Sequence, residues 1–86
     1  MLLTFYYEGH IEAGHAQDIG IHTTFGEAID RFCSETGIPK RDWCFSWSAL
    51  HWDYKWQRQQ RSTPHELGLT DDNEVFVLCI PRRVNN

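Results

Sequence analysis

The sequence predicts an α+β fold in which a single amphipathic helix packs against a β-sheet. Residues 24–36 form the one strong helical pattern, with apolar residues spaced along one face. The segments on either side alternate apolar and polar residues, as strands do. Residues 75–80 are almost continuously apolar, which is typical of a central strand. Because no second helix is predicted, the helix must bury its apolar stripe against the sheet.

Two predicted strands precede the helix. Residues 2–7 (LLTFYY) are apolar and aromatic, as expected of a strand. Residues 9–14 contain two glycines and predict a hairpin loop. We expect the second strand over 16–23, where alternation places Ile19 and Ile21 on one face.

The helix carries signals at both ends. Thr24 and Glu27 have the spacing of a capping box, in which a threonine oxygen accepts from a backbone N–H at the start of a helix. Gly37 tolerates the left-handed conformation that ends a helix, and Pro39 prevents continuation. The predicted buried stripe consists of Phe25, Ala28, Ile29, Phe32 and Cys33.

Alternation continues after the helix. Trp43, Phe45 and Trp47 fall on one face of a predicted strand, and a second aromatic ladder follows a short turn. The predicted elements in order are a polar turn at 40–42, a strand at 43–48, a strand at 52–57, a short helical or 3₁₀ turn at 63–69, a tight turn at 71–73, and the last strand at 75–80.

Composition narrows the classes of function. The chain has 86 residues, enough for one domain with one modest core, which we expect over 2–81 with a tail at 82–86. A net charge of −4 argues against a general nucleic-acid or membrane binder, and no apolar run is long enough to span a bilayer. Three cysteines, an odd number without a CxxC pair, favour reduced thiols and a cytoplasmic or nuclear protein.

We expect neither catalysis nor a bound metal or other cofactor. The five histidines are scattered, and His10 and His15, which we expect in a loop, have no cysteine or carboxylate at ligand spacing around them. Cys33 falls on the buried stripe and should be an inert thiol. The acidic pairs Glu8–Glu12 and Asp71–Asp72 are typical of solvated turns.

The element order resembles the β-grasp of ubiquitin-like domains, and most closely SUMO and the SUMO-like domains of larger proteins. Three stretches carry the resemblance: FCSETGIP at 32–39, FSWSALHW at 45–52, and STPHELGLTDDNEV at 62–75. The third is the most specific, because it is similar to the Thr-Pro-x-Glu-Leu-Gly-Met segment and acidic turn of the family. The resemblance implies a ββαββ(3₁₀)β mixed sheet whose first and last strands run parallel, with the helix across the concave face.

The resemblance further implies a non-catalytic domain that binds proteins, in a ubiquitin or SUMO pathway or elsewhere. Conjugated modifiers end in Gly-Gly, whereas this chain ends PRRVNN, so we expect it not to be conjugated as given. Ser46 stands where ubiquitin has an aliphatic residue in its binding patch. Residues 54–61 are extra relative to the modifier.

SUMO-like domains bind apolar peptides between the second strand and the helix, where the peptide adds a strand to the sheet edge. The alternative is that these side chains are ordinary core. The residues that would line this groove are Gln17, Ile19, Ile21, Phe25, Ile29 and Arg31.

The outer face of the sheet is the second candidate site. If Val75 and Val77 point to the helix, the intervening residues form an exposed apolar surface, which on a small domain usually marks a contact. An inverted register, or coverage by the extension, is the alternative. The predicted contact residues are Tyr6, Ser46, Phe76 and Leu78.

The aromatic and basic extension at 52–61 is the third candidate. Trp, Tyr and Arg are enriched at interface hot spots, and the same mixture stacks on single-stranded bases. Because the whole chain is acidic, nucleic acid is the minor alternative, and a hairpin packed on the core is another. The residues concerned are Tyr54, Lys55, Trp56, Arg58 and Arg61.

A fourth hypothesis is self-association, in which an acidic turn docks on a basic patch of the next copy. The acidic half would be Asp71, Asp72 and Glu74, and the basic half Lys40, Arg41, Lys55 and Arg58. Because the acidic motif is incomplete, we expect a monomer with protein partners.

Overall fold

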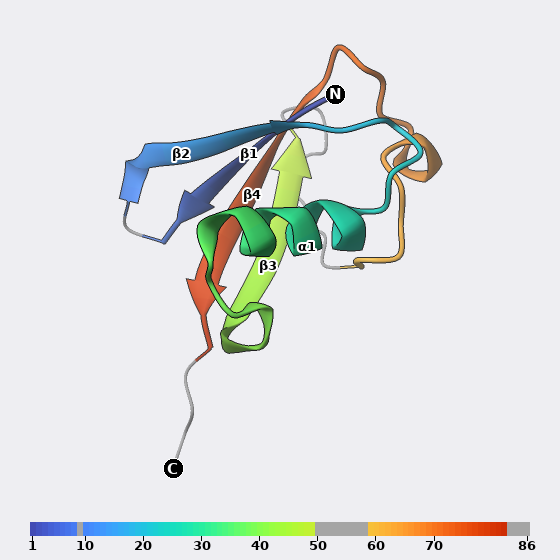
Figure 1. The fold of residues 1–86 in the computed structure, drawn as a ribbon. Coiled ribbons are helices and arrows are strands. Elements are labelled where there is room, and N and C mark those ends of the chain that lie inside the picture. The colour runs from blue at the N-terminus through green and yellow to red at the C-terminus, as the bar shows by residue number, and fades with distance from the viewer. Residues whose placement is uncertain (9, 50–58, 83–86) are drawn as a thin grey trace.

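The computed structural model describes residues 1–8, 10–49 and 59–82, and it contains a four-stranded mixed sheet with one α-helix across one face (Figure 1). The strand order is β2-β1-β4-β3. β1 and β4 pair in parallel, whereas β2 and β3 pair antiparallel with their neighbours. This arrangement confirms the predicted α+β β-grasp. The strands are β1 (Leu2–Tyr7), β2 (His10–Asp18), β3 (Trp43–Ala49) and β4 (Glu74–Pro81).

The prediction for β2 was wrong in its bounds. The strand begins at His10, inside the predicted hairpin loop, and ends at Asp18, whereas residues 19–24 form a turn and connection. The reason is pairing: Leu2 lies opposite Asp18 and Phe5 opposite His15, so β2 ends opposite the first residue of β1. Alternation around Ile19 and Ile21 identified a buried face but not a hydrogen-bonded partner.

α1 (Phe25–Thr36) follows its predicted signals closely. The Thr24 hydroxyl accepts a hydrogen bond from the Glu27 backbone N–H at 3.1 Å. Gly37 adopts φ 79°, and its N–H donates to the Cys33 carbonyl. The five stripe residues predicted from the sequence are the buried residues of the helix.

The core lies between α1 and the inner face of the sheet. Phe32 stacks on Phe5 with ring centroids 4.2 Å apart, and Phe25 stacks on Trp47 at 4.6 Å. On β4 the buried residues alternate with half-buried ones, as a strand covered fully on only one face should show. The inward residues of β4 are Val75, Val77 and Cys79.

Two short 3₁₀ helices lie in the connections. η1 (Lys40–Asp42) precedes β3, and η2 (His65–Leu67) ends at Gly68 with φ 78°, within the predicted 63–69 turn. The strand predicted at 52–57 lies outside the described residues. Within the part of the chain that is described, no helix is long and apolar enough to cross a membrane.

Candidate functional site

The outer face of β1, β4 and β3 brings together the predicted sheet-face residues. Leu78 of β4 lies opposite Tyr6 on one side and opposite Ser46 on the other. Phe76 lies two residues earlier on the same face, and its ring centroid is 6.1 Å from that of Tyr6. Tyr6, Phe76 and Leu78 are half-buried, whereas Ser46 is buried. The predicted orientation of β4, with Val75 and Val77 toward the helix, is therefore correct.

The apolar surface extends beyond the predicted set. Ile80 is half-buried on the same strand, and Leu2, at 38% exposure, is the most exposed large apolar side chain among the described residues. Gly14 of β2 lies beneath Tyr6, because a Cβ at position 14 would lie 2.9 Å from the Tyr6 ring. Glycine thus lets the ring lie across the neighbouring strand. We define the outer apolar face as Leu2, Tyr6, Phe76, Leu78 and Ile80.

The predicted groove residues gather between β2 and α1, but most of them are core. Phe25 and Ile29 are almost completely buried, and Ile19 is 7% exposed. Ile21 is partly buried against the same cluster, and Arg31 is exposed. In this conformation these side chains present little open surface to a peptide.

Polar contacts also hold β2 to the helix. Buried Gln17 donates from Nε2 to the Ala28 carbonyl at 3.0 Å, but its Oε1 has no partner in the described structure. Arg31 donates to the Asp18 carbonyl at 3.3 Å and to Glu35 at 2.9 Å. A peptide that adds to the β2 edge near Asp18 must therefore compete with Arg31 for that carbonyl.

Glu35 receives a second contact from β2. His15 Nε2 lies 3.2 Å from Glu35 Oε2, and the His15 ring packs edge-on against Phe32. The hydrogen bonds from Arg31 and His15 hold the pKa of Glu35 below its usual 4.5. Because the sequence separates these residues by 20 positions, periodicity did not indicate the contact.

Only the end of the predicted extension is described. Tyr54, Lys55, Trp56 and Arg58 lie outside the described residues, and Arg61 is exposed. The chain beside Arg61 joins the start of α1, because the Gly26 N–H donates to the Gln60 carbonyl at 2.7 Å. The Phe25 N–H donates to the Ser62 carbonyl at 3.1 Å. These two bonds satisfy helix amides that lack partners within the helix.

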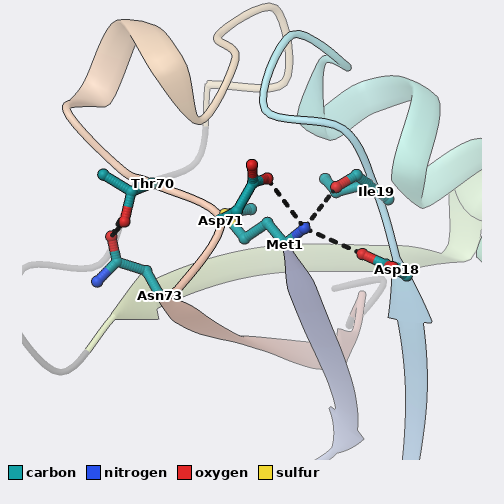
Figure 2. Close-up of polar contacts among 6 residues, drawn as sticks. All are labelled: Met1, Asp18, Ile19, Thr70, Asp71 and Asn73. Carbon is teal, nitrogen blue, oxygen red and sulfur yellow. Dashed lines mark hydrogen bonds and ion pairs between the residues drawn. The ribbon is translucent and has the colours of Figure 1, made fainter.

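An acidic cluster surrounds the Met1 ammonium at the start of β1 (Figure 2). The ammonium donates to Asp18 Oδ1 at 3.0 Å and to the Ile19 carbonyl at 2.8 Å, and Asp71 Oδ1 lies at 3.5 Å. The hydrogen bond to Asp18 is the main cause that raises the pKa of this ammonium above 8.0. Beside it, Asn73 accepts from the Thr70 N–H at 2.8 Å and shapes the turn before β4 (Figure 2).

Opposite charges lie near opposite ends of β4. Asp71, Asp72 and Glu74 flank its start. Its other end joins η1, since the Arg82 N–H donates to the Asp42 carbonyl at 2.8 Å (Figure 1). Lys40 of η1 is paired with Asp30 at 2.7 Å. Lys55 and Arg58, the remaining predicted basic residues, are not described.

Burial disfavours the thiolate form of two of the cysteines. Burial raises the pKa of Cys79 to about 12 and also raises that of Cys33. Both thiols therefore stay protonated and pack as small apolar side chains.

The fold is similar to solved structures at low sequence identity, among them ubiquitin and ubiquitin-like proteins. Caldiarchaeum subterraneum ubiquitin matches with a TM-score of 0.69 and 14% identity, over 100% of this chain and 98% of that chain. The C-terminal ubiquitin-like domain of mouse tubulin-specific chaperone e matches with a TM-score of 0.70 and 7% identity, over 100% and 90%. ATBAG1, solved in complex with HSP70, matches with a TM-score of 0.60 and 18% identity, over 90% of this chain and 38% of that chain.

No protein-family model and no curated protein sequence matches the chain. At these identities the structural similarity concerns the fold. The chain therefore has the ubiquitin-like β-grasp fold. The closeness to SUMO stays a prediction from the sequence motifs.

Proposed function

We propose that this ubiquitin-like domain is a non-catalytic interaction module that binds a protein partner through its outer apolar face. The observation that carries the proposal is the alignment of Tyr6, Phe76 and Leu78 on two neighbouring parallel strands, opposite the helix-covered core. Their side chains are partly accessible, and an aromatic pair beside aliphatic residues is the composition favoured at the centre of protein interfaces.

The surrounding surface fits a protein ligand. Hydroxyl groups of Thr4 and Ser48 lie opposite Phe76 on the flanking strands, so small polar groups border the apolar centre. Interfaces commonly combine a buried apolar centre with a polar rim. The groove between β2 and α1 ranks below this face, because Phe25 and Ile29 are already used in the core.

A titration followed by NMR tests the proposal. The ¹⁵N-labelled domain is titrated with a SUMO-conjugating enzyme, with a SUMO-interacting peptide, and with single-stranded RNA. We expect the protein ligand to shift amides around Tyr6, Phe76 and Leu78. Leu78→Lys should abolish these shifts, whereas Ile21→Ser, the matched change on the groove side, should preserve them.

The same titration separates the alternatives. The peptide could instead shift only residues 17–29, and these shifts could be lost in Ile21→Ser. This result would place the binding site in the groove. Shifts at Arg61 with RNA alone would favour the nucleic-acid hypothesis for the extension. Either result would contradict binding at the outer apolar face.

Head-to-tail self-association is the second candidate. Acidic residues flank the start of β4, and η1, which contains the basic residues Lys40 and Arg41, lies at its other end. It ranks second because two of its charges are already paired within the chain: Lys40 with Asp30, and Asp71 with the Met1 ammonium. Mass in solution tests it, with Asp72→Lys as the variant. A wild-type oligomer that the variant dissociates would support it, whereas a monomer in both chains would exclude it.

A further inference from the structure

Two histidines far apart in the sequence meet on the surface. His22 lies in the turn between β2 and α1, and His65 is the first residue of η2. Their ring centroids are 4.8 Å apart, and the ring planes are inclined by 48°. Both residues are exposed, so their ring nitrogens are within reach of solutes.

The backbone fixes this pair. The His65 N–H donates to the carbonyl of Ile21, the residue before His22, at 2.9 Å. Pro64, which directly precedes His65, is fully buried. Its carbonyl accepts from the Leu69 N–H at 3.0 Å. The Cα positions of both histidines are therefore held by the fold, and little chain entropy is lost when the rings share a ligand.

The ring separation matches that of two imidazoles on one metal ion. An imidazole nitrogen lies about 2.0–2.1 Å from Zn²⁺, and the ring centre lies roughly 1.2 Å beyond the nitrogen. At a tetrahedral angle, two such rings have centres about 5 Å apart. The observed 4.8 Å is close to this value, so the two rings lie near enough to share one ion.

We propose that His22 and His65 form a two-histidine site for a divalent first-row transition ion such as Zn²⁺, Ni²⁺ or Cu²⁺. Imidazole is a preferred ligand for these ions, whereas Mg²⁺ and Ca²⁺ select oxygen. Among the described residues no group of three His, Cys, Asp or Glu side chains could hold a metal. The site thus supplies two ligands and leaves the other coordination positions to water or to a donor from a second molecule.

Calorimetric titration of the domain with ZnCl₂ tests the site. The variants are His22→Gln and His65→Gln, and His15→Gln is the matched control, because His15 is a histidine engaged elsewhere with Glu35. Mutation of outer-shell groups already costs roughly 10–100-fold in metal affinity. We therefore expect each direct-ligand variant to bind at least about tenfold more weakly than wild type, and the control to match wild type.

Paramagnetic NMR gives an independent readout. Substoichiometric Cu²⁺ should broaden amide signals around residues 21–23 and 64–66 first, and this pattern should disappear in either direct-ligand variant. Broadening centred on any other residues would overturn the proposal. Zinc affinity that is unchanged in both His22→Gln and His65→Gln, or reduced as much in His15→Gln, would also overturn it.

Discussion

The two faces of the sheet are built from alternate residues of the same strands, yet they differ in burial and in chemistry. On the inner face, Phe5 and Val77 have 0% and 1% exposure and belong to the apolar core cluster. On the outer face, Tyr6 and Phe76 are half-buried and are bordered by hydroxyl side chains. The inner face thus accounts for folding stability, and the outer face can change with less effect on it.

The largest expected effect on the free energy of unfolding is seen when a core phenylalanine is replaced, and a phenylalanine of the outer face provides the comparison. Phe32→Ala should lower the free energy of unfolding by about 3–5 kcal/mol, because it leaves a cavity between Phe5 and Phe45. Phe76→Ala should cost only about 1 kcal/mol. Urea unfolding measures both, and equal losses would show that the outer face is part of the core.

The next effect concerns the close approach of Gly14 and Tyr6. Gly14→Ala places a Cβ 2.9 Å from the Tyr6 ring and should destabilise the domain by about 1 kcal/mol as the ring moves away. Urea unfolding measures the loss, and the Tyr6 ring proton shifts report the displacement. In Tyr6→Ala the same glycine substitution should cost less, because only the contact with Thr4 Cγ2 at 3.1 Å remains; an equal cost there would show that the Tyr6 ring is not responsible.

Replacement of a buried polar side chain, Gln17, should raise the free energy of unfolding rather than lower it. Gln17→Met removes the Oε1 that has no partner in the described structure, at the loss of one hydrogen bond to Ala28. Because an unsatisfied buried oxygen costs more than a neutral hydrogen bond contributes, the variant should be more stable by up to about 1 kcal/mol. Thermal unfolding tests this, and a lower midpoint would indicate that a buried water satisfies Oε1.

The smallest expected effect is the pH-dependent contribution of Glu35 to folding stability. The pKa of Glu35 is lowered in the folded state, first by Arg31 and then by His15. Its ionised form therefore stabilises the fold above the unfolded value of 4.5, and this contribution is lost as pH falls through the lower folded pKa. Glu35→Gln should have a lower urea midpoint than wild type at neutral pH. The difference should vanish in acid, and a constant difference would exclude the ionic contribution.

Local sequence signals predict the structure correctly where neighbouring residues are sufficient to define it. The ends of α1 followed from Thr24 and Gly37, and the orientation of β4 followed from its alternation. Contacts across the chain were not predictable in this way. The pairing of His22 with His65 and of His15 with Glu35 has no periodic signature. The predicted extension contacts at Tyr54 to Arg58 stay predictions.

For β1, α1, β3 and β4 the sequence alone determined the type of element and which of its sides is apolar, because capping, glycine conformation and side-chain periodicity act over a few residues. Tertiary structure alone decided the order β2-β1-β4-β3, the bounds of β2 and the meeting of His22 with His65. A period of two residues specifies a face but not a partner strand. Strand partners are selected by packing and by pairing between distant segments, and that selection is settled only when the whole core forms.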